Sequence, residues 1–264
     1  GISTYISLKK YDFELNAQAV WKILKRTVVI FAIGLGIAYF SLLCRTHNPL
    51  PFDNIRILGV MQRLALSYGV TAIVALLMSH KRIPYLIFVL LAGYFGILFF
   101  GNGYEYNETN ILSVVDRAIL GTNHMYKDNG IDPEGLLSTL PAIAHVLIGF
   151  CCGKLLMEVK DIHEKIERLF IIGTVLTFAG FLLSYGCPIN KKVWSPTFVL
   201  TTCGLASSFL ALLVWFIDVK GYKKWSLFFE SFGVNPLFMY VLGGVLGILF
   251  GSICFPWGEG SISI

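Results

Sequence analysis

Seven long apolar runs follow one another along this chain, and each approaches the roughly 20 residues that cross the hydrocarbon core of a bilayer. They cover residues 27–44, 59–79, 83–100, 139–157, 169–185, 197–217 and 232–250. Only 14% of the 264 residues are charged, against about 25% in soluble domains, and the mean hydropathy is +0.71. The sequence therefore predicts an all-α, polytopic transmembrane helical bundle with about seven spans, whose first partner is the lipid bilayer.

The basic residues are distributed unevenly over the connections between these runs. With a cytoplasmic N-terminus, 14 of the 21 Lys and Arg residues lie on the cytoplasmic side and 7 on the opposite side. Cytoplasmic loops carry an excess of Lys and Arg, so this bias predicts a cytoplasmic N-terminus. Topology thus accounts for the net charge of +5, and no nucleic-acid partner is predicted. Short loops and the lack of a signal peptide favour the bacterial cytoplasmic membrane, and a homo-oligomer stays open.

One connection, residues 101–138, is long and polar. It holds six acidic and two basic residues and is extracytoplasmic in this topology. Its candidates for chemistry are Asp116, Arg117, His124, Tyr126, Asp132 and Glu134. Long loops on a rigid scaffold often carry function, so these side chains are predicted to orient a polar acceptor and to move a proton. The alternative is a solvated loop in which Ser138 and Thr139 cap the helix that follows.

Polar residues also interrupt the apolar runs. Arg63 and Gln62 lie about one turn inside the second run, where a charge costs up to roughly 2–3 kcal/mol. Arg63 either extends to the lipid head groups or faces a cavity and holds an anionic group. His145 is either a site residue or a hydrogen-bonded packing residue. Asn235, before Pro236, breaks the last span, where its amide binds a ligand or repairs the kink.

The sequence gives little support for a metal or a disulfide. Its six cysteines form no Cys-x-x-Cys pair and no His/Cys ligand spacing, so no metal is predicted and free thiols are expected. Lys154 and Arg26, on the cytoplasmic side, are candidates for binding the phosphates of a nucleotide-like donor. The positive-inside pattern explains both residues without such a ligand.

Several short motifs stand in order between about residues 55 and 240. They are Arg56 to Arg63 (RILGVMQR), Asp116-Arg117, Leu120-Gly121, His124, Tyr126, Asp132-Pro133-Glu134-Gly135, Pro188 to Ser195 (PINKKVWS), Asp218 to Gly221, and Gly233-Val234-Asn235. Together these motifs resemble the heparan-α-glucosaminide N-acetyltransferase family. The resemblance is more specific than any one motif, because all of them occur in the same order.

That resemblance implies a transmembrane acetyltransferase, which moves acetyl from cytoplasmic acetyl-CoA, its co-substrate, to an amino sugar (a terminal glucosamine) on the other side. By this resemblance, the acceptor-binding residues are Asp116, Asp132, Glu134, Asn190 and Trp194. The donor-binding residues are Arg63, Gln62, Asn235, Lys154 and Arg26. The family's catalytic histidine belongs to an H-A-x-W-N-G type motif that this chain lacks, so no catalytic residue is certain and His124 is the candidate.

The resemblance also bears on the extent of the chain. Residues 1–264 are predicted to form a single transmembrane acyltransferase core, a fragment without the family's first two spans and its C-terminal spans. Two alternatives stay open. An O-acyltransferase would acylate a hydroxyl of a cell-surface glycan. A transporter or polysaccharide-export component would do no chemistry and would favour inverted repeats with paired broken helices, whereas this sequence has one Pro-broken span.

Overall fold

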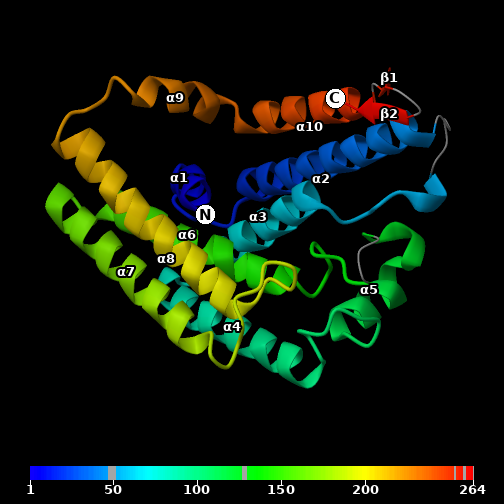
Figure 1. The fold of residues 1–264 in the computed structure, drawn as a ribbon. Helices are drawn as coiled ribbons and strands as arrows, with labels where there is room; N and C mark the ends of the chain where they lie inside the picture. The colour runs from blue at the N-terminus through cyan, green and yellow to red at the C-terminus, as the bar shows by residue number, and fades with distance from the viewer. Residues whose placement is uncertain (47–51, 127–129, 253, 258–259, 264) are drawn as a thin grey trace.

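A computed structural model describes residues 1–46, 52–126, 130–252, 254–257 and 260–263 (Figure 1). Within these ranges, six helices are long and apolar enough to cross a membrane. They are α2 (Ala17–Thr46), α3 (Val60–Leu77), α4 (Ile83–Phe100) with the preceding turn η2 (His80–Arg82), α6 (Thr139–Glu158), α7 (Ile162–Leu183), and α8 (Pro196–Val214) with the turn η4 (Trp215–Val219). The predicted all-α transmembrane bundle is confirmed.

The seventh predicted span, residues 232–250, is not one straight helix. Helix α9 (Ser226–Val234) and helix α10 (Pro236–Ser252) meet at a bend of 84°, and together they pass as one broken span. Asn235 separates them with a non-helical backbone, φ −134° and ψ 64°. Proline lacks the N–H and crowds the preceding turn, so the break predicted at Asn235-Pro236 is confirmed. The predicted start at residue 232 was wrong, because the helical segment begins at Ser226.

The first span is also longer than predicted. Helix α2 begins at Ala17, ten positions before the apolar run that starts at 27, and a short helix α1 (Ile2–Lys9) precedes it. The side chain of Asn16 accepts a hydrogen bond from Ala19 N at 2.7 Å, which satisfies one of the free N–H groups at the start of α2. Charged residues therefore set the N-terminal limit of the apolar run, although the helix itself continues through them.

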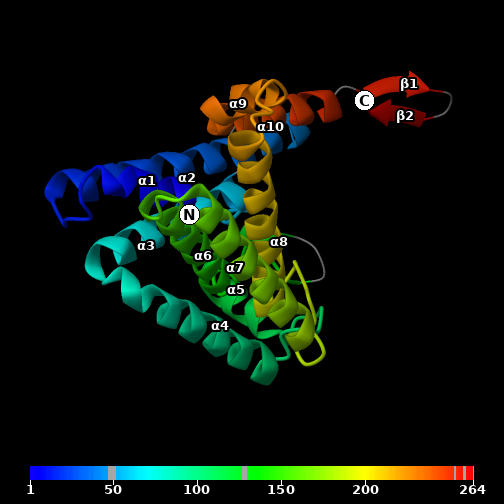
Figure 2. The same ribbon diagram turned by 90° about the vertical axis from the view of Figure 1, so that its left-hand side faces the viewer.

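Helix α6 occupies the centre of the bundle. It packs against α1, α3, α4, α7 and α8, while α3 lies between α6 and α2, and α10 lies alongside α2 (Figures 1 and 2). Half of the membrane-spanning window of α3 and of α6 is buried, against 6% of that of α2. Ala72 and Ala75 of α3 meet Leu147 and Phe150 of α6 in the largest apolar cluster. Helices α3 and α6 are therefore the most buried of the candidate spans in the described ranges.

Glycines bring α7 and α8 close together. A Cβ atom at Gly173 or Gly180 of α7 would collide with the backbone of α8, and one at Gly204 of α8 would collide with the backbone of α7. Small residues at such contacts let helix backbones approach within a membrane. This hairpin fixes the position of the connecting loop, residues 184–195, over the end of α6.

The polar connection 101–138 is ordered by its own helix, α5 (Ile111–Leu120), which is followed by the turn η3 (Thr122–His124). The amide of Asn110 accepts from Leu112 N at 2.9 Å and donates to Gly103 O and Glu105 O, so it both caps α5 and closes the loop before it. Leu112 packs against Tyr94 and Leu98 of α4. The remaining described elements are the turn η1 (Phe52–Asn54) and one antiparallel pair, β1 (Cys254–Trp257) and β2 (Gly260–Ser263).

We predict that Gly204→Ala lowers the thermal unfolding midpoint in detergent. The added Cβ would lie 2.5 Å from Thr177 N and 2.7 Å from Gly173 O, both of which are backbone atoms. Overpacking of this kind costs about 1–3 kcal/mol. Gly96→Ala in α4 is the control, because nothing lies within 4 Å of a Cβ there and Ala is favoured over Gly in a helix by about 1 kcal/mol. Equal midpoints for the two variants would contradict the close packing of α7 and α8.

Candidate functional site

A polar cluster of Arg56, Arg63, Asp132, Glu134 and Ser138 lies at the start of α3. It is organised around Asp132, which is fully buried in the connection 101–138. One carboxylate oxygen, Oδ2, accepts from Tyr126 N at 2.9 Å and from Arg56 Nε at 3.2 Å. The other, Oδ1, accepts from Glu134 N at 2.9 Å and from Arg56 Nη2. Four donors satisfy this carboxylate, so Asp132 serves as an anchor with no oxygen left over for a ligand.

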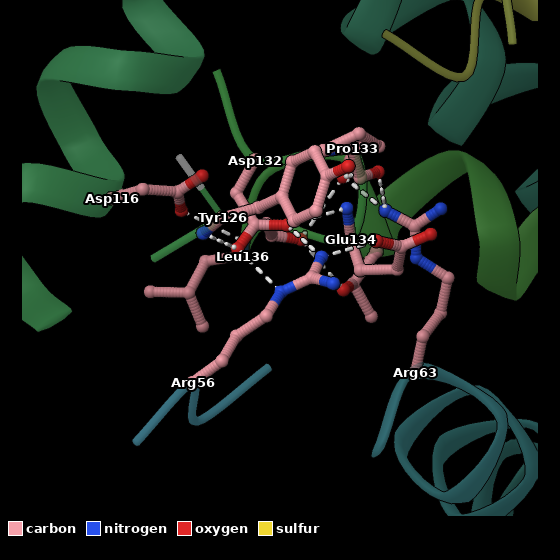
Figure 3. A network of polar contacts seen from close by, with 11 residues as sticks. Arg56, Arg63, Asp116, Tyr126, Asp132, Pro133, Glu134 and Leu136 are labelled. Carbon is pink, nitrogen blue, oxygen red and sulfur yellow. Dashed lines mark hydrogen bonds and ion pairs between the residues drawn. The ribbon is translucent and has the colours of Figure 1, made fainter. Parts of the chain in front are cut away.

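Arg56 joins two carboxylates of the loop. Its Nη2 donates to both Asp132 and Glu134, and its guanidinium lies 4.7 Å from the ring centre of Tyr126 (Figure 3). Burial works to lower the pKa of Arg56, but hydrogen bonds and charge from Asp132 and Glu134 outweigh it and raise that pKa above its ordinary value. The side chain of Glu134 is 16% exposed and that of Asp132 is not exposed. Glu134 is thus the carboxylate of this pair that a ligand can reach.

Arg63 turns into the protein and does not extend to the lipid head groups. It is only 5% exposed, and its Nη2 donates to Pro133 O and to Ser138 Oγ (Figure 3). Its guanidinium lies 4.5 Å from the ring centre of Trp194. The interpretation of Arg63 as an interfacial anchor is therefore wrong, and the arginine belongs to the polar cluster.

Ser138 does not cap α6, contrary to the alternative reading of the loop. Its hydroxyl donates toward Pro133 O at 3.1 Å and Gly135 O at 3.0 Å and accepts from Arg63, and it makes no capping hydrogen bond. Thr139 Oγ1 also donates to Gly135 O, at 3.0 Å. The hydroxyls of Ser138 and Thr139 therefore bond to carbonyl oxygens of the 132–138 turn. Ser138 also links this turn to Arg63.

Asp116 lies beneath the same turn and is fully buried. Its Oδ1 accepts from Leu136 N at 2.8 Å, whereas its Oδ2 has no partner among the described residues. A Cβ at position 135 would lie 1.9 Å from Oδ2, so only glycine lets the turn pass over this carboxyl. Burial, with a further contribution from the charge of Asp132, raises the pKa of Asp116 to about 6.

His124 ties the connection 101–138 to the segment before α3. Its Nδ1 lies 2.8 Å from Ile55 O, and its own carbonyl accepts from Ile57 N at 3.1 Å. A carbonyl oxygen only accepts, so Nδ1 carries the hydrogen and Nε2 is the basic nitrogen of the neutral ring. The side chain is half-buried.

The loop between α7 and α8 holds Asn190 and Trp194. Asn190 Oδ1 accepts from Lys192 N at 2.9 Å, and its Nδ2 donates to Tyr106 OH at 2.6 Å. Ser195 caps α8 by accepting from Phe198 N. Asn190 therefore joins this loop to the connection 101–138. Trp194 of the same loop lies against the guanidinium of Arg63.

Of the other predicted donor residues, only Gln62 shares a cavity with a member of this cluster, Arg56, within the described ranges. Gln62 is buried against Gly34 of α2 and lines a cavity of about 240 Å³ that Arg63 and Asn235 do not line. Asn235 is exposed at the bend between α9 and α10. Lys154 lies 3.8 Å from Glu158 near the far end of α6, and Arg26 is exposed, 4.7 Å from the ring centre of Tyr68. Arg63, Gln62 and Asn235 thus do not share one cavity.

Sequence reasoning placed Arg56 in a motif but did not assign it to the site. A signal was present, because the loop holds six acids against two bases and a buried carboxylate needs a cation. Only the fold shows that Arg56, and not Arg117, supplies it: Arg117 pairs with exposed Glu108 at 2.9 Å.

No metal centre accompanies the cluster. In the part of the chain that the structure describes, no three His, Cys, Asp or Glu side chains are placed to hold a metal ion. Cys44, Cys151, Cys152, Cys187 and Cys203 are free thiols, and the side chain of Cys254 lies outside the described residues.

Comparison with known proteins gives two relatives. The chain is 27% identical to the heparan-alpha-glucosaminide N-acetyltransferase of Homo sapiens, with 87% of its residues aligned, and 27% identical to that of Mus musculus, with 91% aligned. It spans less than half the length of these curated relatives, 42% and 45%. No family profile matches the chain.

We predict that Asp116 makes stability fall as pH rises. The folded state holds its proton up to a pKa of about 6, against a usual value of 3.8, so the folded state binds more protons between these values. Stability is then greatest at the acid side of this window and is lost as pH rises through about 6. In Asp116→Asn, the thermal midpoint should fall less over the same window.

The control for this prediction is Asp53→Asn, which changes an exposed carboxylate of η1. It should keep the pH dependence of the unmodified protein. An Asp116→Asn variant with the unmodified slope would show that Asp116 does not titrate in this range.

Proposed function

We propose that the protein belongs to the heparan-alpha-glucosaminide N-acetyltransferase family, as its similarity to two such enzymes supports. It would then transfer acetyl from cytoplasmic acetyl-CoA to the amine of a terminal glucosamine across the membrane. Similarity and the apolar helices support an integral multi-pass transmembrane acetyltransferase. The identity of donor and acceptor, and the two sides of the membrane, are part of the proposal.

The observation that carries the acceptor side is the cluster of Arg56, Asp132 and Glu134. An amino sugar presents hydroxyls and an ammonium group, and a partly exposed carboxylate suits both. Glu134 is such a group, while Asp132 fixes Arg56 and thereby the orientation of Glu134. Asp116 acts on the same turn through Leu136 N. Asn190 and Trp194 would close the acceptor site from the α7–α8 loop.

The acceptor amine must lose a proton as it attacks. His124 is the candidate base in this chain, since Nδ1 is committed to Ile55 O and Nε2 is free to accept a proton. It lies in the same connection as Glu134. His124 is proposed for this role without the family's own histidine motif, which this chain lacks.

The donor side requires a long molecule. Lys154, one of the two proposed phosphate-binding residues, lies in the last turns of α6, and Arg26, the other, lies in the first half of α2. Ser138 and Lys154 are separated by about 24 Å of helix at 1.5 Å per residue. A thioester on a long flexible arm, as in acetyl-CoA, would place its phosphates at one end and its acyl group at the other. Gln62 and Asn235 would then act nearer to α10.

We predict that Asp132→Asn in the full-length protein lowers acetyl transfer by roughly 100-fold, the loss expected when a substrate-positioning group is misplaced by about 1 Å. Asn lacks the charge that holds Arg56, so Glu134 loses its orientation. The measurement uses detergent-purified protein, radiolabelled acetyl-CoA and acceptors that end in glucosamine.

Glu134→Gln is the companion variant, and it should raise the KM for the acceptor more than it lowers kcat. Asp53→Asn, at an exposed carboxylate, should leave both constants unchanged. Normal transfer by Asp132→Asn would remove the cluster from the site. Label transfer only to acceptor hydroxyls would favour the O-acyltransferase, and substrate counterflow without label transfer would favour the transporter.

A further inference from the structure

Arg63 is a buried cation to which no carboxylate is paired in the described ranges. It is 5% exposed, and the ion pairs found there belong to other arginines and lysines. Its Nη2 is used by Pro133 O and Ser138 Oγ, while Nε and Nη1 are buried without a partner. Buried donors that are left unpaired are costly, so the arrangement points to an acceptor that is supplied from outside the chain.

Trp194 presents a second unused donor at the same place. Its ring lies 4.5 Å from the guanidinium of Arg63, and its buried Nε1–H has no partner among the described residues. Its backbone φ is +53°, in the left-handed region that disfavours a bulky side chain. Hydrogen bonds from Trp194 N to Lys191 O and from Ser195 N to Asn190 O hold this conformation. Strain of this kind is concentrated at ligand-binding positions.

His145 connects Trp194 to a cavity that neither Arg63 nor Trp194 itself lines. The ring of His145 in α6 lies 6.1 Å from that of Trp194, and its buried Nδ1 also lacks a described partner. His145 lines a cavity of about 250 Å³ between α6, α8 and the start of α1, together with Gly1, Cys152 and Cys203. The cavity has small and mostly apolar walls, which suit a slender uncharged chain better than a charged group.

The unused groups of Arg63 and Trp194 are all N–H donors. They match an oxygen that only accepts, and they gain most when that oxygen acquires negative charge. We propose that Arg63 and Trp194 form the oxyanion site of acetyl transfer, in which Arg63 Nε–H or Nη1–H and Trp194 Nε1–H donate to the carbonyl oxygen of the acetyl thioester. This inference rests on the proposed function and assigns the acyl-binding end of that site.

The chemistry balances without a further reagent. The amine nitrogen forms a bond to the thioester carbonyl carbon, and the C=O π pair moves onto oxygen, where the two side chains stabilise it. The C=O bond then re-forms and the C–S bond breaks, with its electron pair leaving on sulfur. The proton lost by nitrogen passes to that sulfur, which gives the N-acetyl amide and the CoA thiol.

The central experiment is Trp194→Phe in the full-length protein, which keeps an aromatic ring next to Arg63 but removes the indole N–H. The kcat should fall about 100-fold, as for other oxyanion donors, with the KM for acetyl-CoA changed less than about twofold. Arg63→Lys retains a donor for Pro133 O but loses the planar guanidinium, so its kcat should fall by a similar factor. The double variant should be little slower than either single variant, because both donors serve one oxygen.

Trp225→Phe is the matched control, since this indole is 40% exposed and lies at the start of α9, away from the cluster. Its kcat should equal that of the unmodified protein. A thermal midpoint close to that of the unmodified protein must accompany the loss of activity in Trp194→Phe. Unchanged kcat in Trp194→Phe, or a higher KM with unchanged kcat, would overturn the oxyanion assignment.

A second measurement separates this inference from the proposed function. Excess sodium acetate, compared with sodium chloride at equal ionic strength, should raise the thermal midpoint of the unmodified protein but not that of Trp194→Phe. If the unmodified protein transfers no acetyl but acetate still stabilises it selectively, the proposed function fails and the donor site stands. If acetate stabilises neither protein, a water molecule satisfies these donors and the inference fails.

Discussion

The bond between Arg56 and the carboxylates of Asp132 and Glu134 joins the connection 101–138 to the start of α3. Without this cation, Asp132 would be an uncompensated charge in a fully buried position, which is the costly case for any ionisable group. The turn 132–138, the hydroxyls that close it and the position of Glu134 all follow from this contact. The described turn 132–138 is thereby joined to the segment that leads into α3.

Helices α3 and α6 give that contact a rigid base. Both begin at the polar cluster, and both are half buried along their membrane-spanning windows, unlike α2 at 6%. The glycine-packed pair α7 and α8 fixes the loop that carries Trp194. Sites supported by packed helices hold their side chains more accurately than sites on free loops. The start of α3, the turn 132–138 and the α7–α8 loop can therefore meet at Arg63 in one geometry.

The two arginines differ in a way that suggests a division of roles. Arg56 is paired with two carboxylates and retains its charge, whereas the hydrogen-bond partners of Arg63 among the described residues are a carbonyl and a hydroxyl. A paired cation positions its neighbours, and an unpaired one retains capacity for a ligand. The acceptor carboxylate and the acyl-binding donors of the proposed reaction would then both lie at the 132–138 turn, where an amine and a thioester would have to meet.

Hydropathy was sufficient to predict the helical membrane fold, because lipid requires every spanning backbone group to be bonded within its own helix. It also located the polar loop, while the proline of Asn235-Pro236 located the break in the last span. It could not predict that α2 begins at Ala17, since charges end an apolar run without ending a helix. Nor could it predict that Arg56 pairs with Asp132, or that Arg63 turns inward onto Trp194. Those contacts join residues 76 and more positions apart, and packing of α3, α6 and the α7–α8 loop brings them together.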